Sequence, residues 1–238
     1  MIVINTVRLL IIILITVFSA VLGTLTLLFT FSRNMAILAS SFVWSNVIFL
    51  VCGVKLKIKY VERCRGKGMG IFVANHSSHM DIPAMFLASP VPLYFIAKKE
   101  LSKVPFMGWY MRLVGMIFID RSDKDKAYQS IAKAGELIKK GRTVMTFPEG
   151  TRSKDGKLGS FKRGSFILAK EAKIPIFPVG IKGSYEIIQP GKFKIKSGTI
   201  EVIFGEAIFP ETYANLSVEE LAALCKSKVQ ELISDIKG

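Results

Sequence analysis

At 238 residues, the chain can hold one sizeable hydrophobic core with an appendage, but not two full independent domains. Its 33 basic and 18 acidic side chains give a net charge of +15, which is compatible with nucleic acid or an anionic membrane as partner. The three cysteines, Cys52, Cys64 and Cys225, form no spaced pair typical of a zinc site or a disulfide framework. This sparse, odd count favours a reducing compartment.

The first 54 residues carry two basic side chains, Arg8 and Arg33, and no acidic ones. An uncharged run from Leu9 to Phe31 would extend roughly 35 Å as a helix, enough to cross a hydrocarbon core. A second uncharged run, Met35 to Val54, follows a short polar link. The pattern predicts a membrane-embedded two-helix hairpin over 1–54, either spanning the bilayer or lying in one leaflet.

A basic flank follows the hairpin, and the positive-inside tendency places it, with the rest of the chain, in the cytoplasm. A cleaved signal peptide fits less well, because the apolar core is too long and the first seven residues lack positive charge. With an apolar anchor present, membrane lipid is the predicted anionic partner and nucleic acid is not. The flank consists of Lys55, Lys57, Lys59, Arg63, Arg65 and Lys67.

Residues 55–238 alternate between strand and helix patterns, which predicts an α/β domain with a mixed, largely parallel sheet flanked by helices. Strands are predicted at 55–62, 71–75, 93–99, 116–121, 143–147 and 174–183, and a β-hairpin at 192–205, turning about Ser197 and Gly198. Helices are predicted at 81–89, 105–115, 122–141 and 161–172, and a last helix after Ser217.

Several helix ends carry capping signals. Asp81 is expected as the N-cap of the first helix of this domain, with Pro83 in its first turn. Ser122 is expected to cap the helix that Gly141 closes. Ser217 and Glu220 predict a capping box for the last helix, which is expected to bury Leu221, Leu224, Leu232 and Ile236.

Both histidines of the chain fall in "NHSSHMD", residues 75–81, directly after a predicted strand. Ligands of α/β sheets bind outside the carboxyl ends of strands, so this segment, "FIDR" and "FPEGTRS" are expected to meet in one cleft. A metal site is disfavoured, because a histidine-rich hydrolytic centre needs more imidazole than the chain has. The alternative is a base with an orienting carboxylate, which His76 and Asp81 form if the intervening residues make a turn.

Four blocks in this order resemble the glycerolipid acyltransferases, especially the 1-acyl-sn-glycerol-3-phosphate acyltransferases. The first block, asparagine and histidine followed after four residues by aspartate, is matched by Asn75, His76 and Asp81. The others are matched by "VPFMGWYMRLVGMIFIDR", by Phe147 to Ser153 and by Ile174 to Ser184. The resemblance covers residues 75–184, and the apolar N-terminal segment fits the family as well.

The resemblance implies transfer of a fatty acyl group to the sn-2 hydroxyl of lysophosphatidic acid, forming phosphatidic acid. His76 is the expected base and Asp81 its orienting acid, without a covalent acyl-enzyme, so Ser77 and Ser78 are assigned to turn hydrogen bonds rather than nucleophilic attack. The donor is acyl-coenzyme A or acyl carrier protein, and no cofactor or metal is expected. The setting is the cytoplasmic face of a bacterial-type inner membrane.

The acceptor's phosphate needs cations and hydrogen-bond donors. Arg152 offers a bidentate fork, Gly150 close backbone approach and Thr151 a hydroxyl, while Arg121 and Lys98 or Lys99 are further candidates. The family places Glu149 at the glycerol end of the acceptor, and an ion pair with Arg152 is the alternative. Glycerol 3-phosphate as acceptor, a non-catalytic module that binds anionic lipid, and a metal-dependent phospholipid hydrolase remain as rival functions.

Overall fold

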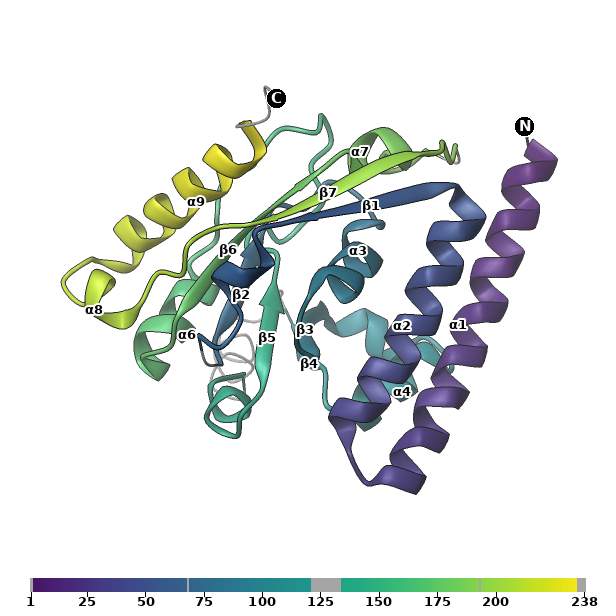
Figure 1. Ribbon diagram of the computed structural model, residues 1–238, viewed down its shortest axis with the longest axis horizontal. Helices are drawn as coiled ribbons and strands as arrows, with labels where there is room; N and C mark the ends of the chain where they lie inside the picture. Colours follow the sequence, from purple (N-terminus) through teal and green to yellow (C-terminus); the bar gives the residue numbers. More distant parts are fainter. Residues whose placement is uncertain (1, 68, 121–133, 193, 235–238) are drawn as a thin grey trace.

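The computed structural model describes residues 2–67, 69–120, 134–192 and 194–234 (Figure 1). Two long helices, α1 (Ile2–Thr30) and α2 (Arg33–Cys52), form a hairpin beside an α/β domain. The side chain of Ser32 caps α2 by accepting a 3.3 Å hydrogen bond from the Met35 N–H. Gly53 closes α2 with φ 65°, a left-handed conformation that glycine adopts without strain, and the first strand follows at once.

The sheet has seven strands in the order β1-β7-β6-β2-β5-β3-β4. All neighbouring strands run parallel except β6 and β7, which are antiparallel. The predicted mixed, largely parallel sheet is therefore confirmed. The strands are β1 (Val54–Lys59), β2 (Ile71–Ala74), β3 (Leu93–Lys98), β4 (Ile117–Ile119), β5 (Thr143–Thr146), β6 (Ile176–Lys182) and β7 (Gly198–Phe204).

Helices cover both faces of this sheet, and β2 shows how its side chains are divided between them. Ile71 and Val73 point into a core shared with α6 and α9, whereas Phe72 and Ala74 point into a core shared with α2 and α3. The helices of the domain are α3 (Asp81–Ala88), α4 (Met107–Val114), α6 (Gly164–Ala172), α7 (Ser184–Ile187), α8 (Pro210–Tyr213) and α9 (Val218–Ser234), with 3-10 turns η1 (Val61–Arg63) and η2 (Lys99–Lys103). Residues 134–139 are also helical.

The last helix largely follows its sequence signals. The Glu220 N–H donates to the Ser217 hydroxyl at 3.1 Å, and the Ser217 N–H donates to the Glu220 carboxylate at 2.7 Å, which confirms the capping box. Leu221 is fully buried as predicted, whereas Leu224 and Leu232 are only partly buried. Ala222, Cys225 and Val229 complete the buried stripe. The predicted contacts of Ile236 and the cap at Ser122 lie outside the described residues.

The predicted β-hairpin over 192–205 is wrong. Only its second half forms a strand, β7, which pairs in parallel with β1 and antiparallel with β6. One edge of β7 is thus occupied by β6, the preceding strand, and the other by β1 from the start of the domain, so no edge is left for residues 192–197. Alternating apolar residues predict a strand here but not which strand pairs with it.

The N-terminal helical hairpin, formed by α1 and α2, is packed against the α/β domain and shares its core. Ile37, Phe49 and Cys52 of α2 are buried in the same hydrophobic cluster as Phe72 and Phe177 of the sheet. Both helices are long and apolar enough to cross a membrane by length and composition. The polar side chains of α2 are divided between protein and surface: Ser40, Ser41 and Ser45 are buried, while Asn46 is exposed.

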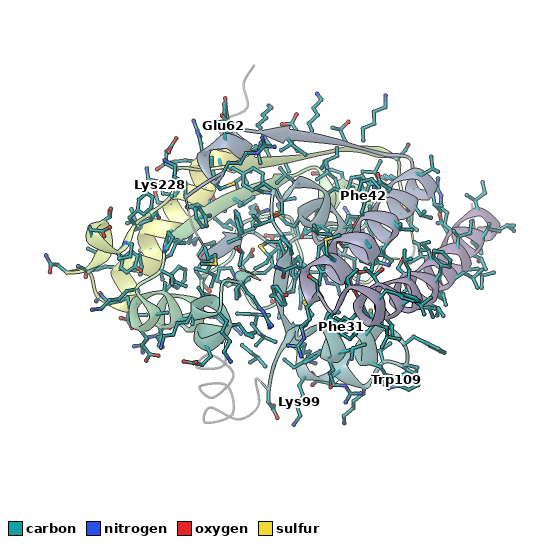
Figure 2. The ribbon with its side chains drawn as sticks, turned by 60° about the horizontal axis from the view of Figure 1, so that its bottom comes forward. Phe31, Phe42, Glu62, Lys99, Trp109 and Lys228 are labelled. Atoms are coloured by element: carbon teal, nitrogen blue, oxygen red, sulfur yellow. The ribbon has the colours of Figure 1, made fainter. Side chains whose placement is uncertain are left out.

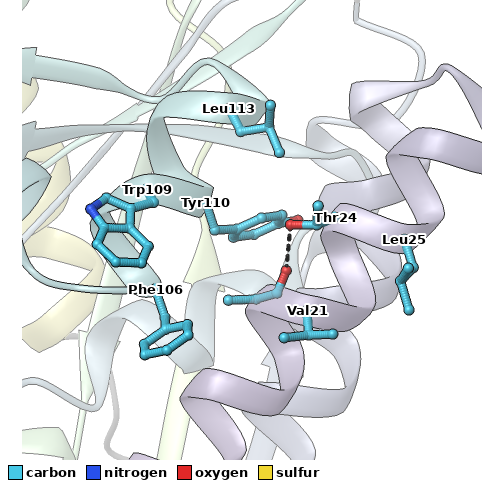
Figure 3. A pocket seen from close by; sticks show the side chains of 8 residues that line it. Val21, Thr24, Leu25, Phe106, Trp109, Tyr110 and Leu113 are labelled. Carbon is cyan, nitrogen blue, oxygen red and sulfur yellow. Dashed lines mark hydrogen bonds between the residues drawn. The ribbon is translucent and has the colours of Figure 1, made fainter.

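Tyr110 of α4 fastens the hairpin to the domain. Its hydroxyl lies 2.7 Å from the Ser40 hydroxyl and donates to the Ala36 carbonyl at 2.9 Å. Beside it, an open apolar cavity of about 400 Å³ lies between α1 and α4, lined by Val21, Leu25, Phe106, Trp109 and Leu113 among others (Figure 3). Because Phe106 and Trp109 are also largely exposed, this face presents continuous apolar surface.

Replacing Gly23 with alanine should loosen the hairpin. A Cβ at Gly23 would overlap the Tyr110 hydroxyl, which its two hydrogen bonds hold in place. We expect a loss of about 1–3 kcal/mol in unfolding free energy, measured by thermal denaturation in detergent. Gly135→Ala is the matched control: its Cβ would lie 3.4 Å from Leu168, an ordinary contact, so this change should be neutral or stabilising. Equal melting temperatures for the two variants would contradict the proposed packing role.

Candidate active site

The segment "NHSSHMD" lies at the carboxyl end of β2, next to the carboxyl end of β5. Asn75 fixes it there: its amide group donates to the Ile181 carbonyl at 2.8 Å, and its carbonyl accepts from the Ile181 N–H at 2.7 Å. These two hydrogen bonds extend the backbone pairing of β2 with β6, with the Asn75 side chain in place of a backbone amide. Asn75 therefore anchors the loop, and the loop carries His76 away from the sheet.

His76 and Asp81 meet through the turn that their spacing required. The Nδ1 atom of His76 lies 2.8 Å from the Oδ2 atom of Asp81. The His76 side chain keeps 15% of its surface exposed, whereas Asp81 has none. With Nδ1 held by the carboxylate, Nε2 is the ring nitrogen that remains to exchange a proton with a bound molecule.

Asp81 is held by more than His76. The same Oδ2 atom accepts hydrogen bonds from the N–H groups of Ser77 at 2.8 Å and Ser78 at 2.9 Å. These donors, with the positive end of α3, compensate the buried charge. Asp81 is nevertheless not the N-cap that the sequence predicted: Met80 takes that position, because the Asp81 carboxylate turns back to the preceding loop.

The loop after β5 contacts both the ring and the backbone of His76. The ring of Phe147 stacks on the imidazole with centroids 4.1 Å apart and planes 13° apart. The backbone N–H of His76 donates to the Glu149 Oε1 atom at 2.7 Å, and the backbone carbonyl of His76 accepts from the Ser153 N–H at 2.8 Å. The imidazole is thus fixed on its face, at Nδ1 and through its backbone, a preorganisation that favours catalysis.

Glu149 bridges two loops through main-chain hydrogen bonds. Its Oε2 atom accepts from the Gly159 N–H at 2.9 Å, while Oε1 holds the His76 N–H. Burial raises the pKa of Glu149, and the two N–H donors oppose that rise. Within the described residues, Glu149 forms no ion pair with Arg152, so that alternative is wrong. Its oxygens are turned to the protein backbone instead.

The second histidine has a different environment. His79 makes no hydrogen bond to Asp81 within the part of the chain that the structure describes. The His79 residue is exposed at the surface, and partial desolvation by the surrounding loops, followed by the electrostatic influence of Arg152 and His76, lowers its pKa. The loop of residues 149–152, the EGTR loop, lies next to the histidine segment, since the Ser153 N–H that follows it donates to the His76 carbonyl at 2.8 Å.

Stability should decline on acidification to a small extent because of His79, a weak effect since the residue is exposed and its charge is screened by solvent. Its folded pKa is below the ordinary value of 6.5, so between the two values the unfolded state binds more protons. The contribution is complete above pH 6.5 and is lost as pH falls through the folded pKa. His79→Gln should remove this part of the decline between pH 7 and 5, measured by denaturant unfolding. An unchanged pH profile in that variant would rule out a contribution from His79.

The residues predicted to bind phosphate are only partly brought together. Gly150 has φ 76° and lies beside the ammonium group of Lys162, since a Cβ there would stand 3.0 Å from its Nζ atom. Thr151 is exposed and Arg152 is partly exposed in the same loop. Lys98 pairs with Glu100 at 3.2 Å, and Lys99 with Asp120 at 2.9 Å, so acidic neighbours occupy both lysines. Arg121 lies outside the described residues.

The serines of the histidine segment have structural partners. The hydroxyls of Ser77 and Ser184 lie 2.9 Å apart, and the Ser78 hydroxyl donates to the Ile188 carbonyl at 2.8 Å. The expected turn bonding is confirmed for Ser78, whose oxygen also accepts from the Met80 N–H at 3.3 Å. Ser77 instead forms a long-range contact to the block that begins at Ile174.

Two contributors to the site escaped sequence reasoning. Phe147 stands inside the third block but was given no role, and its stacking on His76 follows from the adjacency of β2 and β5. Lys162 follows the glycine-containing loop of residues 148–160 and reaches back to Gly150. In the sequence, Lys162 is a basic residue just after that loop and cannot be distinguished from an ordinary surface lysine. No three His, Cys, Asp or Glu side chains gather as a metal-ligand set among the residues searched, which are the described ones.

Comparisons with known proteins cover most of the chain. A family model described as acyltransferase matches residues 55–182. The 1-acyl-sn-glycerol-3-phosphate acyltransferases of Escherichia coli K12 and Pseudomonas aeruginosa are 32% and 33% identical. Those alignments cover 77% and 79% of this chain, and 75% and 72% of the relatives.

Longer relatives match as well. The enzyme of the same name from Saccharomyces cerevisiae is 33% identical over 80% of this chain, but the match spans only 64% of the yeast protein. A chloroplastic relative from Brassica napus is 36% identical over 58% of this chain and is matched over 40% of its own length. The chain thus spans less than two thirds of these two relatives.

One solved structure matches over nearly the whole length. The crystal structure of the 1-acyl-sn-glycerophosphate (LPA) acyltransferase PlsC from Thermotoga maritima has a TM-score of 0.80 and 29% sequence identity, covering 98% of each chain. Coverage of this extent includes the N-terminal hairpin together with the sheet and its helices. The match therefore confirms the fold as a whole, including two apolar N-terminal helices.

Proposed function

Because this chain belongs to the acyltransferase family that includes the 1-acyl-sn-glycerol-3-phosphate acyltransferases, we propose that it acylates lysophosphatidic acid. The fatty acyl group passes from a thioester donor, acyl-coenzyme A or acyl carrier protein, to the sn-2 hydroxyl, giving phosphatidic acid. The observation that carries this proposal is the imidazole of His76, held at Nδ1 by buried Asp81 and stacked on Phe147. Simple phosphate binding requires none of this.

The chemistry follows from that geometry. The Nε2 atom of His76 takes the proton of the acceptor hydroxyl while its oxygen attacks the thioester carbonyl carbon. The resulting imidazolium is stabilised by Asp81, which the N–H groups of Ser77 and Ser78 hold in place. The tetrahedral intermediate then collapses, the carbon–sulfur bond breaks, and the proton passes from His76 to the leaving thiolate. The step needs neither a covalent acyl-enzyme nor a cofactor.

The acceptor's phosphate is assigned to the EGTR loop. Arg152 supplies charge and a bidentate donor set, Lys162 adds a cation beside Gly150, and the positive φ of Gly150 shapes the backbone there. Glu149 acts by positioning His76 and the loop rather than by accepting a hydrogen bond from glycerol. Lys98 is the weaker candidate, because it is exposed and paired with Glu100.

Membrane association follows from the apolar surface of the hairpin and α4. At the open end of the hairpin, the Arg8 side chain of α1 donates to the Ile195 carbonyl at 3.0 Å. Near the turn of the hairpin, Tyr110 holds the start of α2 through the Ala36 carbonyl, so the hairpin is fastened to the domain at both ends. A hairpin fastened in this way cannot extend away from the domain across a bilayer. We therefore favour insertion into one leaflet, on the cytoplasmic face of a bacterial-type inner membrane.

The test is acceptor-dependent thiol release by the detergent-solubilised full chain. Acyl-coenzyme A and acyl carrier protein thioester are each offered with lysophosphatidic acid, with glycerol 3-phosphate or with no acceptor. We expect release that requires lysophosphatidic acid and phosphatidic acid as the lipid product. Release that requires glycerol 3-phosphate instead would change the acceptor. No acceptor-dependent thiol release with either donor, while phospholipid still binds, would indicate a non-catalytic lipid-binding module.

A further inference from the structure

A second polar pocket, the tip pocket, lies where the hairpin turns. It has a volume of about 420 Å³, and its polar lining comes from Ser32, Arg33 and Asn34 at the start of α2, from Tyr94 of β3, and from Lys140 and Arg142. Tyr94 and Arg142 stand at the amino ends of β3 and β5, whereas His76 lies at the carboxyl end of β2. The tip pocket is thus at the opposite edge of the sheet from the candidate active site.

Three cations converge on this pocket, and no carboxylate lines it. Arg33 and Arg142 both approach Gly115: a Cβ there would lie 3.4 Å from the Nη1 atom of Arg33 and 3.3 Å from that of Arg142. Within the described ranges, neither arginine nor Lys140 forms an ion pair. Like charges this close repel one another unless an anion lies between them.

Arg142 gives an independent indication of a ligand. Its guanidinium lies over the ring of Tyr94, 4.9 Å from the centroid, but its Nη1 atom is buried and has no hydrogen-bond partner among the described residues. A buried donor on a charged group is costly to leave without a partner. The Tyr94 hydroxyl donates to the side-chain Oδ1 atom of Asn34 at 2.7 Å, which joins β3 to the start of α2 at this pocket.

The start of α2 adds donors to these charges. Ser32 satisfies the N–H groups of Met35, through its side chain, and of Ala36, through its carbonyl. The N–H groups of Arg33 and Asn34 are the first two of the helix and have no carbonyl partner within it. The helix dipole also favours a negative charge at this end. A phosphate group has the charge and the acceptor oxygens that these donors require.

We propose that the tip pocket binds the phosphate group of an anionic phospholipid, at a site separate from the acyl acceptor. The lipid source is favoured because Phe29 and Phe31, next to the pocket, are 82% and 89% exposed and would lie against the acyl chains. Free phosphate shares the headgroup chemistry but makes no use of these two rings. The proposal does not depend on the acyl-transfer activity.

The test counts lipids bound to the full chain in a non-ionic detergent by native mass spectrometry. Short-chain phosphatidylglycerol, phosphatidylcholine and inorganic phosphate are the separate probes, and all proteins carry Arg152→Gln so that the active-site phosphate contact is removed. The pocket variants are Arg33→Gln, at an exposed position, and Arg142→Gln. The matched control is Lys228→Gln, which removes the same charge on α9, away from Phe31 (Figure 2). Thermal denaturation checks that each variant is folded.

We expect one retained phosphatidylglycerol and no retained phosphatidylcholine, with affinity reduced about tenfold or more by each arginine variant and unchanged by Lys228→Gln. Binding of inorganic phosphate with the same dependence on Arg33 would keep the site but assign it to a free anion. Retention that is indifferent to Arg33→Gln in a folded protein, or no anion bound at all, would overturn the proposal.

Discussion

Replacing His76 with alanine should reduce acceptor-dependent thioester cleavage by about 10² to 10⁴, the usual contribution of a general base. Replacing His79 with alanine should leave the rate within the same order of magnitude. The difference follows from the contacts: His76 alone of the two is bound to Asp81 and stacked on Phe147. The measurement is steady-state thiol release at saturating lysophosphatidic acid, with both proteins at matched concentration.

Two controls keep this comparison interpretable. Asp81 retains its bonds to the N–H groups of Ser77 and Ser78 when the imidazole is removed, so His76→Ala should fold, which near-ultraviolet circular dichroism can verify. His76→Gln keeps much of the volume beside Phe147 and should be as inactive as the alanine variant. If both His76 variants retained full rates, or if His79→Ala alone abolished activity, the assignment of the base would be wrong.

Replacing Glu149 with glutamine should cost about 1–3 kcal/mol of unfolding free energy and also lower the catalytic rate. Both carboxylate oxygens accept backbone N–H groups, from His76 at 2.7 Å and from Gly159 at 2.9 Å. Glutamine has one acceptor oxygen, so its NH₂ group would face one of the two donors. Denaturant unfolding gives the stability change, and kinetics with each substrate varied separate kcat from KM.

Because Glu149 is a positioning residue, we expect the loss mainly in kcat, with a smaller change in the KM of the acceptor. A loss confined to that KM would indicate direct contact with glycerol. The pH profile gives a second readout: the raised pKa of Glu149 stabilises the protein below its ordinary value of 4.5, and this contribution disappears as pH rises through the folded pKa. Glu149→Gln should remove this pH dependence of the unfolding free energy. Glu211→Gln, at an exposed position, should change neither the unfolding free energy nor kcat.

Much of the fold was predictable because local patterns report burial and helix ends directly. The capping box at Ser217 and Glu220 lies where the sequence placed it. The pairing of β7 with β1 was not predictable, since these strands are joined only by packing across the whole domain. Asp81 was misplaced as a cap because capping preference and interaction with His76 compete for one carboxylate, and the latter prevails.

The site divides in the same way. The spacing of His76 and Asp81 allowed their contact through a short turn, and the family resemblance singled out this pair; the structure contains that contact. The contacts of Glu149 depend on how the loop after β5 lies against the end of β2, and the sequence carries no direct sign of that. Lys98 looked suitable as a free cation, but Glu100 two residues later neutralises it, and such surface pairing depends on side-chain orientation.

The pairing of β1 with β7 also bears on how the protein is made. Val54 lies opposite Gly198, so the first strand to leave the ribosome receives its partner only after most of the chain has been synthesised. Contacts between such distant residues form slowly, and an unpaired strand edge is prone to aggregation in the interval. Early tethering of the nascent chain by α1 and α2 would keep that edge away from other unfinished chains.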